Sequence, residues 1–173
     1  MKLEKLSAET GAARLDELTA LLLDSVAHGA SIGFLAAITR GEAAAYWRSV
    51  LEELPGGARL LLGAFDEAGR LTGAVQLAMA TRPNSRHRAE VQKLFVFGAA
   101  RRRGVGASLM TRLEAEALAR GRTLLFLDTS VGAAGAEKFY ERSGYVRAGG
   151  IPDYAANPDG TLVPNVFFYK RLA

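Results

Sequence analysis

Cysteine is absent from this chain of 173 residues, and histidine occurs only twice, as His28 and His87. Without cysteine, the protein has no disulfide, no thiolate metal ligand and no cysteine nucleophile. Neither histidine has neighbours in a metal-ligand pattern, so each is interpreted as a loop or surface residue. We therefore expect no metal site.

Long apolar runs are also missing. No run approaches the roughly 18 residues that cross a bilayer, and the opening segment Met1–Lys5 lacks the apolar region of a signal peptide. A length of 173 residues with 49% hydrophobic content predicts one domain, residues 1–173, with a substantial core. We expect a cytoplasmic protein without a membrane partner, either a monomer or a homodimer.

The most informative segment is Val91–Met110. Its first part, Val91–Phe97, is short, β-branched and aromatic, which predicts a buried strand that Gly98 ends. Beyond Gly104, apolar residues recur at helical spacing up to Gly121, which is a predicted helix cap. These apolar positions are Val105, Leu109, Met110, Leu113 and Ala117.

The glycines of this segment lie at the start of the predicted helix. The first backbone N–H groups of a helix have no intrahelical partner and the helix dipole is positive there, so an anion is favoured. Gly104 and Gly106 let phosphate oxygens approach without meeting a Cβ, while Arg101, Arg102 and Arg103 add positive charge. The segment is interpreted as a loop that binds a polyanion.

Two other interpretations compete with this one. A dinucleotide-binding turn requires G-x-G-x-x-G directly after the strand, and Asp128 lies near the distance expected for its ribose-binding acid. However, Leu109 occupies the place of the third glycine, and residues 98–103 separate the strand from the glycines. The other interpretation is a simple helix cap beside solvated arginines.

Basic residues concentrate in this part of the sequence. Between Arg82 and Arg103, seven basic residues stand against one acid, Glu90, a local net charge of +6 in a chain whose net charge is +4. The seven are Arg82, Arg86, Arg88, Lys93, Arg101, Arg102 and Arg103. Confinement of the charge favours a compact polyanion over a duplex, so no nucleic-acid partner is expected.

The rest of the chain predicts a mixed α/β layer fold. The further predicted helices are Ala12–Val26 and Glu42–Leu54, and the further predicted strands are Leu60–Phe65, Leu71–Ala80, Thr123–Leu127, Tyr145–Ile151 and Val166–Lys170. The helix that follows Val91–Phe97 makes this strand parallel to Thr123–Leu127. The turn-rich loops His28–Arg40 and Pro152–Asn165 are expected to select the substrate.

A family resemblance follows from these motifs. The pattern R-x-x-G-x-G over Arg101–Gly106, after a strand, resembles the acyl-CoA pyrophosphate loop of the GNAT N-acetyltransferase superfamily. Phe139-Tyr140 followed by Ser143-Gly144-Tyr145 resembles a second signature of that family, which implies a helix over Ala136–Arg142. Five further segments resemble its tabtoxin-resistance-type branch: Gly29–Leu35, Glu90–Leu94, Leu127–Thr129, Pro158–Gly160 and Phe168–Lys170.

This resemblance implies a central, mostly antiparallel sheet flanked by helices, with the two parallel strands splayed at their C-terminal ends. It implies acetyl-CoA as the acetyl donor. The implied cofactor-binding residues are Leu94, Phe95 and Val96 beside pantetheine, and Arg101, Arg102, Arg103, Gly104, Val105, Gly106, Ala107 and Ser108 around the pyrophosphate. The implied activity is acetyl transfer to the primary amine of a small, amino-acid-like or toxin-like molecule. The alternative is an acyl-CoA-binding sensor of the same fold without catalysis.

Three side chains are the candidates for catalysis. Glu90 begins the cofactor strand and resembles the family's general base; the alternative is an ion pair with Arg86, Arg88 or Lys93. Asp128, interpreted as the end of the next strand, is expected to hold the substrate ammonium with Glu90, or else to cap a turn. Tyr140 matches the family tyrosine that donates to the departing thiolate; the alternative is core packing.

Overall fold

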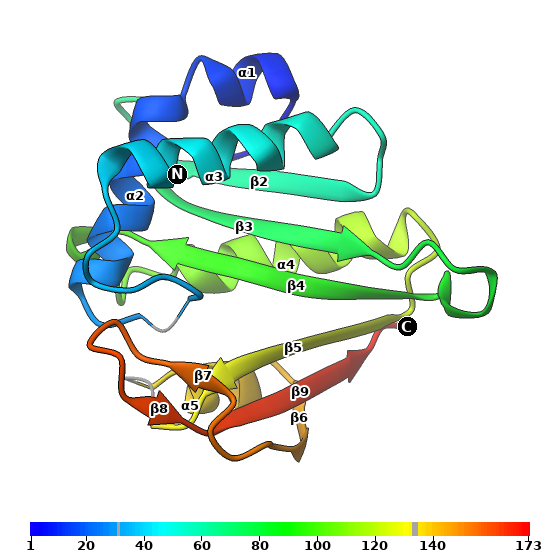
Figure 1. The fold of residues 1–173 in the computed structure, drawn as a ribbon. Coiled ribbons are helices and arrows are strands. Elements are labelled where there is room, and N and C mark those ends of the chain that lie inside the picture. The colour runs from blue at the N-terminus through cyan, green and yellow to red at the C-terminus, as the bar shows by residue number, and fades with distance from the viewer. Residues whose placement is uncertain (31, 133–134) are drawn as a thin grey trace.

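The computed structural model describes residues 1–30, 32–132 and 135–173 (Figure 1). Residue 31, within the predicted loop His28–Arg40, lies outside the described residues. Helices α1 to α5 span Ala8–Ala12, Leu15–Ala27, Arg40–Glu53, Val105–Leu118 and Ala136–Arg142. Strands β1 to β9 span Lys2–Leu6, Arg59–Phe65, Leu71–Met79, Arg88–Val96, Leu124–Ser130, Val146–Gly149, Ala155–Ala156, Leu162–Val163 and Asn165–Arg171.

Seven strands form one sheet in the order β1-β2-β3-β4-β5-β9-β6, and β7 and β8 form a separate hairpin. Neighbouring strands are antiparallel except β4 and β5, which α4 connects as a crossover. The expected mixed α/β fold with a mostly antiparallel sheet is thus confirmed. A dinucleotide-binding fold needs a run of parallel strands, which this sheet lacks in the described part of the chain.

The sheet separates two apolar cores. Helices α2 and α3 pack on one face against Leu61 and Phe95, whereas α4 packs on the other face against Leu62 and Val91. In Figure 1, α3 and α4 accordingly lie on opposite sides of the strands. Successive side chains of a strand point to opposite faces, so the apolar run of β2 supplies both cores.

The N-terminal region differs from its prediction. The helix expected over Ala12–Val26 is α2, which begins three residues later because the chain turns at Arg14, and α1 is an additional helix that a capping box between Ser7 and Thr10 starts. Strand β1 was not expected at all. It is an edge strand that pairs with β2, and five residues of mixed polarity carry no strand pattern of their own.

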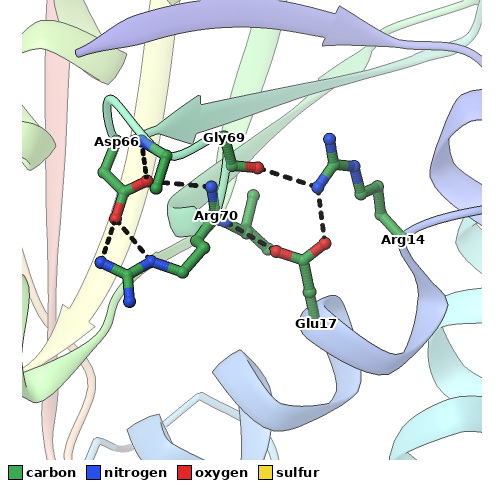
Figure 2. A network of polar contacts seen from close by, with 7 residues as sticks. Arg14, Glu17, Asp66, Gly69 and Arg70 are labelled. Atoms are coloured by element: carbon green, nitrogen blue, oxygen red, sulfur yellow. Dashed lines mark hydrogen bonds and ion pairs between the residues drawn. The ribbon is translucent and has the colours of Figure 1, made fainter.

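Arg14 joins the start of α2 to the β2–β3 turn (Figure 2). Its Nη1 donates to Glu17 Oε1 over 2.7 Å and to the Gly69 carbonyl over 2.9 Å, while Glu17 Oε2 accepts from the Leu71 amide over 2.7 Å. Asp66 and Arg70 close the same turn by an ion pair of 2.8 Å. An open hollow of about 480 Å³ beside this turn contains none of the predicted site residues.

The remaining elements largely follow their predictions. Helix α5 has the predicted bounds, α3 starts at a capping box of Thr39 and Glu42, and Gly121 follows α4 with a φ of +69°. The predicted loop Pro152–Asn165 contains the short β7–β8 hairpin. In the described ranges, no helix is both long and apolar enough to span a bilayer.

Candidate active site

Strands β4 and β5 diverge in the middle of the sheet. Their pairing covers only three residues of each strand and stops at Glu90 opposite Phe126, although β4 continues to Val96 and β5 to Ser130. Figure 1 shows the two strands separating beyond this point. The expected splay is therefore confirmed, and in the described ranges no strand pairs with the backbone edge of β4 on the β5 side from Val91 onward.

A β-bulge in β4 sets the direction of the side chains at this gap. Gln92 pairs with Gln76 but Phe95 pairs with Ala74, so β4 holds one extra residue, and Lys93 has a φ of +54°. The extra residue shifts the register, so side chains beyond the bulge point to the face opposite to the one that strict alternation would give.

Alternation separates the three predicted pantetheine-binding residues, and the bulge before them decides which face each takes. Leu94 and Val96 are half-buried against the α4-side core. Phe95 instead points to the α2–α3 core, is 1% exposed and packs edge-on against Trp47 with ring centroids 5.8 Å apart. The Phe95 side chain is thus a core residue, and only its backbone remains available to a cofactor.

The two predicted acids lie on the same face of the sheet. Glu90 pairs with Phe126, and Asp128 is two residues further along β5, so alternation places all three on the α3 side. Asp128 is predicted to end its strand, but it lies inside the strand, opposite Phe167, because the ladder with β9 continues to Ser130. The interpretation of Asp128 as a turn cap is therefore wrong.

Each acid accepts a hydrogen bond from a carboxamide. Gln92 Nε2 donates to Glu90 Oε2 over 2.8 Å, and Asn165 Nδ2 lies 3.4 Å from Asp128 Oδ2. Asn165 is 2% exposed, and its Oδ1 accepts from the Ile151 amide over 2.9 Å, which turns its NH₂ group toward Asp128. Among the described residues, no salt bridge joins Glu90 to Arg86, Arg88 or Lys93, although the charges of Glu90 and Lys93 interact.

Lys93 is a further charged side chain at the gap that the sequence analysis did not select. Its Nζ donates to the Ile32 carbonyl and lies 5.5 Å from the centroid of the Phe34 ring. Burial lowers the pKa of Lys93, while the charges of Asp128 and Glu90 act in the opposite direction. Lys93 thus brings the loop after α2 to the acid pair; the only sequence signal was a cation inside the predicted cofactor strand.

Tyr140 approaches the gap from the opposite face. It lies on α5, packs against the α4-side core, and contacts the rings of Phe139, Tyr145 and Phe168 at centroid distances of 5.2, 6.0 and 5.9 Å. Burial, with a smaller contribution from the charge of Asp128, raises the pKa of Tyr140 to about 12. The packed ring positions a phenol that keeps its proton at neutral pH.

The predicted phosphate loop has the expected geometry. Gly104 is the N-cap of α4 with a φ of +79°, and the amide of Ser108 makes the first intrahelical bond, to the Gly104 carbonyl, over 3.0 Å. The amides of Val105, Gly106 and Ala107 precede that bond and point out of the helix end. Arg101, Arg102 and Arg103 are all exposed before this turn, and Arg101 Nε lies 3.3 Å from the Val96 carbonyl.

The basic segment of the sequence is not one cluster in space. Arg82, Arg86 and Arg88 lie at or before the start of β4, whereas the Arg101–Arg103 run follows its far end. Eight residue steps of about 3.3 Å separate the two ends by roughly 26 Å. The expectation that the whole excess charge gathers at the phosphate loop is therefore wrong, and only the second group lies there.

The described residues hold no cluster of three or more histidine, cysteine, aspartate or glutamate side chains suited to a metal ion. His28 contacts its own helix instead, with Nδ1 2.7 Å from the Asp24 carbonyl oxygen.

A family model connects this geometry to known proteins. The model of the acetyltransferase (GNAT) family matches residues 15–145, which include β4, the turn before α4, β5 and Tyr140. The chain belongs to the GNAT acetyltransferase family. In this GNAT protein, the segment from β4 to α5 contains the splayed strands and the glycine turn before α4.

Solved structures agree on the GNAT fold. A ribosomal-protein-alanine N-acetyltransferase from Brucella melitensis superposes with a TM-score of 0.81 at 21% identity, covering 99% of this chain and 100% of its own. The yncA protein of Salmonella typhimurium, solved with acetyl-CoA, gives 0.79 at 19% identity, with coverage of 100% and 94%. A phosphinothricin acetyltransferase from Sinorhizobium meliloti, in complex with acetyl-CoA, gives 0.80 at 18% identity, with coverage of 99% and 88%.

Proposed function

We propose that this GNAT protein transfers an acetyl group from acetyl-CoA to the primary amine of a small, amino-acid-like or toxin-like molecule. The observation that carries the proposal is the gap between β4 and β5, with Glu90 and Asp128 on one face and Tyr140 on the other. The acetyl-CoA complexes of two structural neighbours support the choice of donor. The resemblance of Glu90–Leu94 and Leu127–Thr129 to the tabtoxin-resistance branch supports the acceptor class.

The residues present fit a nucleotide thioester. The free β4 edge beyond Glu90 offers backbone groups to an extended amide chain, as a missing strand would take them. The amides of Val105, Gly106 and Ala107, the open approach at Gly104 and the exposed Arg101–Arg103 run suit a pyrophosphate. When bound, acetyl-CoA supplies the thioester whose carbonyl carbon joins the amine as its carbon–sulfur bond breaks.

In this proposal, the acids act on the acceptor amine. Glu90 and Asp128 attract the substrate ammonium electrostatically, and Glu90 takes its proton, directly or through water, so that the nitrogen lone pair is free to attack. Asp128 positions the amine. Tyr140 donates a hydrogen bond to the thiolate from the other face, because its phenol remains neutral.

The test is a screen of small amines and amino-acid analogues for acetyl-CoA-dependent thiol release, followed by variants. Glu90→Gln should keep acetyl-CoA affinity but lower kcat by a factor on the order of 10² near pH 7, the usual scale for loss of a general base. Asp128→Asn should mainly raise the KM of the acceptor. Glu52→Gln, an exposed change on α3, is the control and should leave both constants unchanged.

Two outcomes would contradict the proposal. Wild-type kcat in Glu90→Gln would leave Glu90 no role as base. Tight acetyl-CoA binding with no acetylation of any amine in the screen would favour the sensor over the enzyme.

A further inference from the structure

A chain of hydrogen-bonded polar side chains, buried at Gln76 and half-buried elsewhere, crosses β2, β3 and β4 on the α3 side of the sheet. Arg59 Nη1 donates to Gln76 Oε1 over 2.7 Å and to Gln92 Oε1 over 2.8 Å. Gln92 Nε2 then donates to Glu90, and Gln76 Nε2 donates to the Tyr46 hydroxyl over 2.9 Å. Two hydrogen-bonded branches therefore start at one guanidinium and end at Glu90 and at Tyr46.

The register of the sheet explains why these residues meet. Arg59 and Glu90 lie opposite the same β3 residue, Ala78, and Gln92 lies opposite Gln76. The small Ala78 side chain leaves room for Arg59 to reach across β3. The Arg59 side chain is only 18% exposed, Gln76 is fully buried, and Glu53 accepts a hydrogen bond from Arg59 Nε over 2.7 Å.

Arginine determines the orientation of both amides. A guanidinium has donors only, so each glutamine must turn its carbonyl oxygen toward Arg59 and its NH₂ group away. The reversed amide would place two donors face to face in a buried site, which is strongly unfavourable. The NH₂ group at the far end of each branch therefore donates a hydrogen bond, whether or not a substrate is bound.

We propose that Arg59 is a positioning residue that acts through Gln92 on Glu90 and through Gln76 on Tyr46. The first branch occupies Glu90 Oε2, which fixes the carboxylate and leaves Oε1 for the proton of the acceptor amine. The second branch makes the Tyr46 oxygen an acceptor, so the Tyr46 proton points away from Gln76, on a ring 5.1 Å from Phe34. The catalytic consequence for Glu90 depends on the proposed acetyl transfer, but the orientation of the two amides does not.

The kinetic test breaks one branch at a time with apolar residues of similar shape. Gln92→Met should lower kcat about tenfold, the size expected for one hydrogen bond to a charged group, with the KM of acetyl-CoA unchanged. Gln92→Met combined with Glu90→Gln should be no slower than Glu90→Gln alone within about twofold, because Gln92 acts only through Glu90. Multiplicative losses in the double variant would overturn the positioning role.

Rescue separates positioning from simple support of the fold. Both amide contacts of Arg59 come from one nitrogen, Nη1, so a lysine ammonium can replace them although it loses Glu53. Arg59→Lys should therefore retain most of the kcat that Arg59→Met loses. Equal losses in these two variants, at equal thermal stability, would contradict the proposal.

A measurement without turnover decides the amide orientation independently. In wild type, the side-chain NH₂ resonances of Gln76 and Gln92 in ¹⁵N NMR spectra should exchange slowly with solvent. Glu90→Gln should shift the Gln92 pair and leave the Gln76 pair in place, whereas Gln76→Met should leave the Gln92 pair in place. Rapid exchange of both pairs in wild type would overturn the proposal even in an active enzyme, and an inactive wild type with slow exchange would contradict only the acetyl transfer.

Discussion

At the scale of single residues, the candidate acids are oriented by amides rather than by ion pairs. Arg59 turns the NH₂ group of Gln92 toward Glu90, and the Ile151 amide turns that of Asn165 toward Asp128. A neutral amide can hold a carboxylate in place without bringing a second charge that would compete with a substrate ammonium. Lys93 is the cation at the gap whose charge interacts with both acids, and its burial favours its neutral form.

Tyr140 provides a prediction at the same scale. Its pKa of about 12 lies well above the thiol value of about 8.5, so the phenol keeps its proton and, in the proposed reaction, would donate a hydrogen bond to the thiolate. Tyr140→Phe should lower kcat by about 10²-fold, as loss of a donor to a developing anion does, and leave acetyl-CoA affinity unchanged. Steady-state kinetics with calorimetric titration of acetyl-CoA checks both.

The direction of the pKa shift adds a pH test. The neutral phenol is the donor, and it is lost only as the pH rises through about 12, so the kcat ratio of wild type to Tyr140→Phe should stay constant from about pH 7 to 10. Tyr145→Phe is the control, since the Tyr145 ring lies 6.0 Å from that of Tyr140 in the same aromatic cluster. A ratio that falls toward one below pH 10, or an equal loss in Tyr145→Phe, would exclude the donor role.

At the scale of elements, one bulge and one helix start shape the site. The bulge in β4 turns Phe95 into the α2–α3 core and brings Lys93 to the acids, while α4 begins at Gly104 with a positive φ. Each feature depends on one residue in the left-handed region: the bulge turns the Lys93 side chain toward the acids, and the helix start leaves the first backbone amides of α4 without intrahelical partners. The position of these backbone groups is what a long, extended cosubstrate requires.

Gly104→Ala tests the helix start, and Gly121→Ala at the other end of α4 is its matched control. Both glycines have positive φ, +79° and +69°, and at neither would a Cβ meet another atom within 4 Å. Each change should lower stability by about 1 kcal/mol through backbone strain, a Tm shift of about 2–4 °C. Only Gly104→Ala should also weaken acetyl-CoA binding, measured by calorimetry, because its methyl group stands where phosphate approaches. Equal affinity in the two variants would reduce this turn to a helix cap.

At the scale of the whole molecule, an apolar core covers each face of the sheet, but the pairing between β4 and β5 is incomplete. The α4-side core and the α2–α3 core each pack a full layer, yet β4 and β5 share only three paired residues. A ligand that fills the gap contacts both halves of the sheet at once. Its binding free energy should therefore appear as added resistance of the whole domain to unfolding.

Acetyl-CoA should raise the Tm of the wild-type protein, and CoA should do likewise. At a concentration of about 100 times Kd, the expected gain is about 2.7 kcal/mol, or several degrees for a domain of this size. A thermal scan with millimolar ligand measures it, with NAD as the control. A shift with NAD and none with acetyl-CoA would contradict the proposed cosubstrate.

What the sequence determined by itself was local. The family resemblance around Phe139-Tyr140 predicted α5, the apolar run before Gly98 predicted most of β4, and the glycines predicted the start of α4, because these signals lie in residues near one another in sequence. The motif Arg101–Gly106 likewise pointed to the family. Each of these predictions rests on a short stretch of sequence and does not depend on the tertiary contacts of that stretch.

Tertiary structure decided the arrangement of the site, because that arrangement depends on which strands become neighbours. The ladder with β9 placed Asp128 inside β5, pairing with β3 forced the bulge at Lys93, and the extended length of β4 divided the arginines into two groups. The branches from Arg59 to Glu90 and Tyr46 join three strands and a helix, and no spacing in the sequence connects them. Register and neighbour contacts are set by the free energy of the packed sheet as a whole, so residues far apart in sequence acquire their partners only in the folded molecule.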